Sequence, residues 1–290
     1  MNGSIHPGTE LGRVHLRVRD LQRAARFYTQ GLGLSVLAEG PGRLRLGSEG
    51  RALLELGEAS GASRPGRTAG LYHLALLLPS RLQLARALDR LQRAHVPVSG
   101  FADHLVSEAI YLSDPEGNGI ELYRDRPRER WVEKDGGLLM GTYALDPEGL
   151  LEELERAEDR QEDPQTAGPG EGARLGHVHL QVSDLAASDR FYVQVLGFQL
   201  RMHSGRSAAF VSAGGYHHHI GYNTWAGQLA RASADGTPGL GWFSIQLPDA
   251  QALGEVRARV EQAAVPFREN GRVLRLQDPS GIEIELETAT

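Results

Sequence analysis

An internal repeat is the sequence feature that most constrains the fold. The stretch LGRVHLRVRDLQRAARFYTQGLGL, which begins at Leu11, matches LGHVHLQVSDLAASDRFYVQVLGF, which begins at Leu175. In each copy, apolar and polar residues alternate before an Asp-Leu pair, which predicts a strand, and a pattern of helical period follows. Asp20 is the expected N-cap of the first of these helices. So many matched positions in the two stretches predict that the two halves of the chain have related architecture.

A second kind of unit follows the first in each half. The stretches GLYHLALLLPS and GLGWFSIQLPD each predict a strand, and helices are expected over residues 81–95 and 250–264. Each half ends in two strands around an Asp-Pro turn, DPEGNGIELY or DPSGIEIELE, so that Glu121 corresponds to Glu285. Pro fixes φ and Gly tolerates positive φ, so these turns reverse the chain. We therefore expect four βαβββ units, which begin near residues 11, 71, 175 and 239.

The segment between the halves has a different composition. Residues 147–160, PEGLLEELERAEDR, predict an acidic amphipathic helix, and residues 161–172 are rich in Gly and Pro, as linkers are. The expected fold class is α+β, with four βαβββ modules paired into two domains that have curved mixed sheets. The predicted boundaries are an N-terminal domain, a connecting segment and a C-terminal domain over residues 8–128, 129–172 and 173–290.

Composition excludes several classes of function. The chain has 290 residues, 40% of them hydrophobic and 23% charged, which is ordinary for a globular protein. A net charge of −6 argues against a nucleic-acid partner, and the absence of cysteine excludes thiolate metal sites and cysteine nucleophiles. The sequence shows no apolar signal region and no apolar run of about 18 residues, which predicts a cytoplasmic protein without a membrane partner. The sequence leaves open whether the protein forms a homo-oligomer.

Histidine and glutamate recur at matched positions of the units. His15 and Glu55 are 40 residues apart, and His73 and Glu121 are 48 residues apart, so that each pair joins a unit's first strand to its last. If two units pack as one curved sheet, these four positions converge. Two imidazoles and one carboxylate suit Fe(II) or Mn(II), and Glu55 as a fourth ligand would favour Zn(II) or Ni(II). Taken singly, each residue also has a purely structural explanation.

The C-terminal half keeps part of this pattern, because His179 and His219 are also 40 residues apart. In the run GGYHHHIG, alternate histidines would share a face if the run formed a strand. A second metal site and a hydrogen-bonded structural strand are the two interpretations. The residues of the possible second metal site are His179, His217, His219 and Glu285.

One hairpin brings chemically active groups together. Over residues 103–123, DHLVSEAIYLSDPEGNGIELY, the period of two on both sides of the turn predicts a β-hairpin. His104 is expected in the loop before the first strand, Tyr111 on the first strand and Glu121 on the second. A metal site with acid/base groups beside it follows from this placement. The corresponding positions of the C-terminal half are expected to hold Phe243 in place of His73 and Arg275 in place of Tyr111, which makes that half incomplete.

The repeat and the DL…RFY…LG pattern resemble the vicinal oxygen chelate superfamily, which includes glyoxalase I, bleomycin-resistance proteins and type I extradiol dioxygenases. The stretch from His104 to Glu121 resembles the extradiol ring-cleavage motif: a histidine, an aliphatic-Tyr pair, Asp-Pro-x-Gly and a final glutamate. Several blocks are similar to bacterial catechol 2,3-dioxygenase-like proteins. In the well-known extradiol enzymes the motif lies in the C-terminal half, whereas here it lies in the N-terminal half.

The resemblance implies the glyoxalase/bleomycin resistance/dihydroxybiphenyl dioxygenase fold and a ring-cleaving dioxygenase that uses Fe(II), O₂ and a small aromatic diol. It also implies that His15, His73 and Glu121 bind the iron, that His104 is an acid/base and that Tyr111 bonds the substrate or oxygen. Two alternatives stay open: a glyoxalase-type isomerase or lyase that uses Glu55 as fourth ligand, and a non-catalytic protein that binds a small aromatic compound.

Overall fold

A computed structural model describes residues 3–61, 67–134, 137–159, 172–227, 230, 233 and 236–289. Internal contacts group the chain into two compact units, which we call unit 1 (residues 1–17, 59–72 and 176–290) and unit 2 (residues 18–58 and 73–175). The domain boundaries predicted from the sequence stay a prediction about which parts fold independently. Within the described ranges, no helix is both long and apolar enough to cross a membrane.

The four predicted βαβββ modules are confirmed, and two of them precede residue 126. The first comprises β1 (Glu10–Val18), α1 (Leu21–Arg26) with the π-helical turn η1 (Phe27–Gly31), β2 (Ser35–Gly40), β3 (Arg43–Ser48) and β4 (Arg51–Glu58). The second comprises β5 (Gly70–Leu77), α2 (Arg81–Arg93), β6 (Val98–Asp103), β7 (Ser107–Ser113) and β8 (Gly119–Asp125). The Asp20 side chain accepts a hydrogen bond from the Arg23 amide, so its predicted role as N-cap is confirmed.

The C-terminal half repeats the same order of elements. Its first module comprises β11 (Arg174–Gln181), α4 (Leu185–Asp189) with η3 (Arg190–Val195), β12 (Gln199–Ser204), β13 (Ala208–Ser212) and β14 (Ile220–Asn223). Its second comprises β15 (Gly239–Leu247), α5 (Ala250–Gln262), β16 (Phe267–Asn270), β17 (Val273–Gln277) and β18 (Glu283–Thr288). The predicted α+β class is therefore confirmed, with strands and helices alternating as the sequence pattern indicates.

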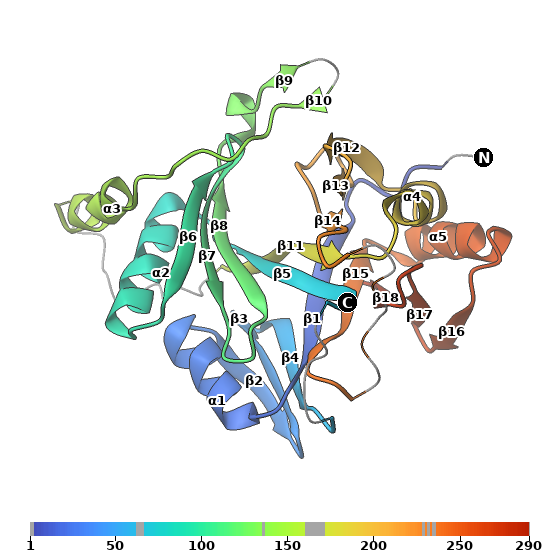
Figure 1. Ribbon diagram of the computed structural model, residues 1–290, viewed down its shortest axis with the longest axis horizontal. Helices are drawn as coiled ribbons and strands as arrows, with labels where there is room; N and C mark the ends of the chain where they lie inside the picture. Colours follow the sequence, from blue (N-terminus) through green and yellow to red (C-terminus); the bar gives the residue numbers. More distant parts are fainter. Residues whose placement is uncertain are drawn as a thin grey trace. The chain divides into compact units, whose positions relative to one another are not determined.

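The connecting segment contains short elements and one longer helix: η2 (Arg128–Arg130), β9 (Glu133–Lys134), β10 (Gly137–Leu138) and α3 (Pro147–Asp159). The helix predicted over residues 147–160 is thus confirmed, and it packs against α2 (Figure 1). Arg81 of α2 donates hydrogen bonds of 3.0 Å to the Gly149 carbonyl and to the Glu153 carboxylate of α3. The predicted linker, residues 161–172, lies outside the described residues except for its last position.

In unit 2, strands β5, β8, β7 and β6 are neighbours in that order, with β5 parallel to β8 and the other pairs antiparallel. The predicted hairpin is confirmed as β7–β8, with Tyr111 opposite Glu121. On the other side of β8, Glu121 is opposite Ala75. Since side chains alternate between the faces of a strand, His73 lies on the same face as Ala75. This register places His73, Tyr111 and Glu121 on one face of the sheet.

In unit 1, strands β16, β17, β18, β15 and β1 are neighbours in that order, as are β12, β13, β14 and β11. Arg275 is opposite Glu285, as predicted, and Ser244 is opposite Glu285 from β15. Trp242, two residues before Ser244, therefore corresponds to His73. The prediction that Phe243 occupies this position is wrong: Phe243 is fully buried on the opposite face. The error is a shift of one residue, which moves a side chain to the other face of a strand.

The repeated Arg-Phe-Tyr and Asp-Pro motifs meet in the core. The Tyr28 hydroxyl donates to the Asp114 carboxylate at 2.9 Å in unit 2, and the Tyr192 hydroxyl donates to Asp278 at 3.0 Å in unit 1. Both tyrosines are fully buried. Burial raises the pKa of Asp278 to about 6. These two motifs thus tie the first helix of each half to a hairpin turn.

Candidate functional site

The centre of the candidate site in unit 2 is a buried pair of a histidine and a carboxylate. The Nε2 atom of His73, on β5, lies 3.1 Å from the Oε2 atom of Glu121, on β8. The residues are 7% and 3% exposed, respectively. A carboxylate at this depth needs a hydrogen bond, a cation or a proton to offset the lost hydration. Two donors bound at about 2.1 Å to one ion at a right angle lie about 3 Å apart, so the observed separation fits metal coordination.

A phenol and a second imidazole lie beside this pair. The Tyr111 ring is 5.9 Å from the His73 ring, measured between centroids, and it packs against the buried residues Ala75, Leu77, Ala109 and Tyr123. His104 lies in the loop between β6 and β7, as predicted, with its Nε2 atom 2.7 Å from the Tyr111 hydroxyl. Its Nδ1 atom is 2.7 Å from the carbonyl oxygen of Gly141. The sequence therefore brings His73, His104, Tyr111 and Glu121 together in unit 2, while their roles stay predictions.

A network of charged side chains supports the His104 loop. Asp103 accepts a hydrogen bond from the Leu105 amide and one of 2.6 Å from Arg126. Glu108, whose side chain is 4% exposed, forms ion pairs with Arg81, Arg124 and Arg126 at 3.1, 2.6 and 3.1 Å. A buried carboxylate with three guanidinium partners is held firmly in place. Sequence reasoning missed this network, although a glutamate within the apolar run of β7 was its available signal.

The other two predicted ligands have partners of their own. In unit 1, the His15 ring stacks on Trp242 at 5.5 Å with an angle of 21° between the rings. Gly241 is so close that a Cβ atom there would lie 2.1 Å from His15 Nδ1, so only glycine fits at this position. In unit 2, Glu55 forms an ion pair with Arg45 of the neighbouring strand at 3.1 Å. His15 and Glu55 as metal ligands stay predictions.

The histidine run of unit 1, residues 217–219, lies in the loop before β14. Alternate histidines were expected to share a face only if the run formed a strand, and that condition is not met. His217 and His218 approach through their Nδ1 atoms at 2.8 Å, and His219 Nδ1 accepts a hydrogen bond from the Ala213 amide. His179, on β11, lies 2.9 Å through its Nε2 atom from the Asn223 side-chain amide. Hydrogen bonds of this kind are expected if the histidines have a structural role.

Glu285, the fourth residue of the possible second site, lies on β18 beside two arginines. It forms ion pairs with Arg275 and, at 3.8 Å, with Arg13, which also binds Glu287 at 3.0 Å. Burial raises the pKa of Glu285, and the arginines act in the opposite direction. Guanidinium groups here supply the positive charge next to the carboxylate. A second metal site stays a prediction.

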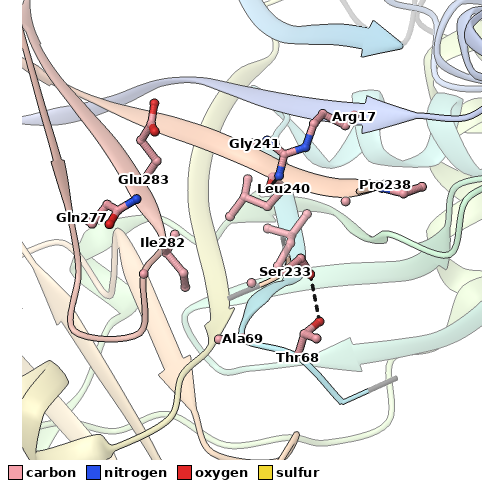
Figure 2. Close-up of a pocket in the computed structure, with 14 residues that line it drawn as sticks. Arg17, Thr68, Ala69, Ser233, Pro238, Leu240, Gly241, Gln277, Ile282 and Glu283 are labelled. Carbon is pink, nitrogen blue, oxygen red and sulfur yellow. Dashed lines mark hydrogen bonds between the residues drawn. The ribbon is translucent and has the colours of Figure 1, made fainter. Parts of the chain in front are cut away.

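A pocket in unit 1 has a volume of about 50 Å³ and is lined in part by Arg17, Thr68, Gln277 and Glu283 (Figure 2). The Arg17 side chain donates hydrogen bonds of 2.9 Å to the carbonyls of Thr237 and Leu240. Sites for organic ligands usually have volumes of about 300–1,000 Å³, so this pocket is too small for an aromatic substrate. Its volume suits only water-sized molecules.

The four βαβββ modules and the buried His73–Glu121 pair define a class of α+β proteins built from repeated modules, with a candidate metal site. The family model of the Glyoxalase/Bleomycin resistance protein/Dioxygenase superfamily matches residues 10–122 and 174–286. The chain belongs to this superfamily, so the predicted resemblance is confirmed.

Individual relatives narrow the comparison. The chain is 42% identical over 281 residues to the Catechol-2,3-dioxygenase of Bacillus subtilis (strain 168), which covers 95% of this chain and 96% of the relative. A putative dioxygenase from Bacillus subtilis subsp. subtilis str. 168 has a similar fold, with a TM-score of 0.68, 14% identity and coverage of 99% of this chain and 86% of that one. Glyoxalase I from Zea mays gives a TM-score of 0.57 at 16% identity, over 97% and 92% of the two chains. The two structural similarities concern the fold alone.

Proposed function

We propose that this protein is an extradiol dioxygenase, which cleaves the ring of a catechol-like aromatic diol with O₂ at a metal held by His73 and Glu121. The observation that carries the proposal is the placement of His104 and Tyr111 beside the His73–Glu121 pair. The name of the 42% identical relative, Catechol-2,3-dioxygenase, supports the same reaction. Of the three candidate functions, this one uses all four side chains.

Fe(II) is the proposed metal. Two histidines and one carboxylate with open positions are typical of non-haem Fe(II) oxygenases, whereas the same donors also accept Mn(II), Zn(II) or Ni(II). His73 and Glu121 supply two of the three ligands. When bound, the ion supplies Lewis acidity, which favours ionisation of a diol hydroxyl at neutral pH.

The third ligand comes from the resemblance to the superfamily. His15 is the one that the superfamily resemblance implies. We propose His15 as the third ligand; in unit 1 its ring stacks on Trp242.

The protein's own residues divide the remaining tasks. Once Nε2 of His104 carries a proton, the Tyr111 hydroxyl can donate its hydrogen bond to an oxygen that gains negative charge during the reaction. His104 is placed to accept a proton from the diol and to return it later, which commonly accelerates a reaction by about 10²–10⁴-fold. Small aromatic diols and O₂ are the partners that these groups fit.

Metal analysis of single variants tests the assignment. His73→Ala and Glu121→Ala should lose both metal and ring cleavage, while His104→Phe should keep the metal and lose ring cleavage. His15→Ala should also lose metal, and a His15→Ala variant that keeps the metal would remove His15 from this role. His203→Ala is the matched control, because His203 is exposed and pairs with Asp189 on the surface. Normal turnover of His73→Ala would refute the site.

Stoichiometric zinc or nickel with isomerase activity would instead favour the glyoxalase-type alternative. Binding of an aromatic compound without any metal would favour the binding protein. Metal analysis, isomerase assays and binding assays on one protein preparation distinguish these two outcomes.

A further inference from the structure

The hydrogen bonds of His104 define which of its nitrogens carries the proton. Its Nδ1 atom lies 2.7 Å from the carbonyl oxygen of Gly141, which has no hydrogen to donate. A hydrogen bond at this distance therefore requires a proton on Nδ1. In the neutral imidazole the Nε2 atom is then an acceptor, and the Tyr111 hydroxyl, 2.7 Å away, is its donor.

The carbonyl belongs to the segment between β10 and α3, which follows the second module and is not part of any predicted catalytic motif. Tyr143 of this segment exchanges two backbone hydrogen bonds of 2.9 Å with Asp103, the last residue of β6. The Gly141 amide approaches the His104 carbonyl at 3.4 Å. Residues 139–143, hereafter the docking segment, are thus fixed to the strand end that precedes His104.

The His104 loop itself is tightly built. Leu105 has a φ of 69°, a left-handed conformation that is unusual for leucine, and its amide donates to the Asp103 side chain at 2.9 Å. The His104 amide donates to the Ser107 carbonyl at 2.8 Å. Arg126 neutralises the Asp103 carboxylate at 2.6 Å. Because the loop and the docking segment are both anchored, the orientation of the imidazole is set by the backbone and not by side-chain packing alone.

We propose that the docking segment, through the carbonyl of Gly141, holds His104 as the Nδ1–H tautomer with its Nε2 lone pair directed at Tyr111. Gly141 is then a positioning residue for the acid/base function that we propose for His104, so this inference rests on the proposed function. When Nε2 takes up a proton, the carbonyl accepts a charge-assisted hydrogen bond from the imidazolium, which stabilises that form. The connecting segment therefore takes part in assembling the site.

The test uses two substitutions whose effects should cancel. A Cβ atom on Gly141 would lie 2.5 Å from Cε2 of Tyr143, so Gly141→Ala must displace either the ring or the Gly141 carbonyl. Tyr143→Ala removes the obstacle and leaves both backbone hydrogen bonds with Asp103 in place. The single variant Gly141→Ala should lower kcat about tenfold to a hundredfold, within the usual range of acid/base catalysis, and should leave KM and metal content unchanged. The double variant should recover, and Tyr143→Ala should resemble the parent.

The tautomer is measured directly by long-range ¹H–¹⁵N spectra of the full chain labelled at histidine, with the His104 signals assigned by their loss in His104→Gln. The expected pattern is Nδ1–H in the parent and a changed pattern in Gly141→Ala. An Nε2–H pattern in the parent, or an altered pattern in Gly141→Ala with undiminished kcat, would overturn the proposal.

If Gly141→Ala does not fold, the parent spectrum decides the tautomer. In that case the double variant should have the kcat and the His104 pattern of Tyr143→Ala, and a double variant with reduced kcat but an unchanged His104 pattern would overturn the catalytic part. The spectra require no turnover, so a parent that cleaves no catechol would refute the proposed function and leave the tautomer result standing.

Discussion

Substitution of Tyr28 by Phe tests whether the repeated Arg-Phe-Tyr and Asp-Pro motifs stabilise the fold by their buried hydrogen bond. Tyr28 is fully buried, and burial together with Asp114 raises its pKa well above the usual value, so the hydroxyl stays a donor at any working pH. The change removes one oxygen atom and the 2.9 Å hydrogen bond to Asp114. Hydrogen bonds to charged groups contribute about 1.5–3 kcal/mol.

The expected cost lies at the lower end of this range. The Asp114 Oδ2 atom keeps a second donor, the side-chain amide of Asn118 at 2.8 Å, so the carboxylate is not left without a partner. The equivalent Asp278 has no asparagine in its turn, and its Oδ2 atom has Tyr192 as its one hydrogen-bond donor in the part of the chain that the structure describes. We therefore expect Tyr28→Phe to cost about 1.5–2 kcal/mol and Tyr192→Phe about 2–3 kcal/mol.

Urea unfolding at pH 7.5, followed by circular dichroism and tryptophan fluorescence, measures both variants. Tyr143→Phe is the matched control, because Tyr143 is 57% exposed and the same chemical change there should cost less than about 0.5 kcal/mol. If the two units unfold separately, Tyr28→Phe should shift the transition of unit 2 and Tyr192→Phe that of unit 1. A Tyr28→Phe variant as stable as the parent, or one less stable than Tyr192→Phe, would refute the reasoning.

Three further predictions concern charges. The folded-state pKa of Asp278, about 6, exceeds its ordinary value of 3.8, so the folded protein binds this proton more tightly than the unfolded chain does. The carboxyl therefore makes the protein less stable as pH rises from about 4 to 6, by about 3 kcal/mol relative to Asp278→Asn. Urea titrations across this pH range measure the difference, and parallel stability curves for the parent and the variant would contradict the prediction. Glu108→Gln leaves three arginines with a neutral partner and should cost about 3–5 kcal/mol in the same assay, whereas a cost below about 1 kcal/mol would show that the network contributes little. Glu55→Gln should change the rate of ring cleavage less than about twofold, because the Glu55 carboxylate is already paired with Arg45 in a partly exposed ion pair. Loss of metal in this variant would instead support the glyoxalase-type alternative.

Local patterns in the sequence predicted most of the fold. Alternation of apolar residues placed the strands, Asp20 marked a helix start, and the Asp-Pro turn fixed the hairpin that sets Tyr111 opposite Glu121. Each of these follows from the chemistry of neighbouring residues. The hairpin pattern alone therefore predicts that His104, Tyr111 and Glu121 lie close together.

What the sequence did not predict depends on contacts between distant residues. Gly141 meets His104 through a backbone carbonyl, which leaves no side-chain pattern, and it comes 37 residues later in the chain. The histidine run at residues 217–219 forms a loop because Gly214 and Gly215, both with positive φ, end the preceding strand. The prediction of Phe243 at the position of His73 is wrong by one residue, because the stretches GLYHLALLLPS and GLGWFSIQLPD pair His73 with Trp242 when both are counted from their first glycine.

Iron content and oxygen consumption of anaerobically purified protein test the central claim most directly. The measurement is metal analysis followed by addition of catechol under air, with absorbance and an oxygen electrode recorded together. The account predicts about one iron per chain, a yellow ring-cleavage product and one O₂ consumed per catechol, with both signals lost in His73→Ala. Protein that holds iron at this level but consumes no oxygen with catechol or substituted catechols would contradict it.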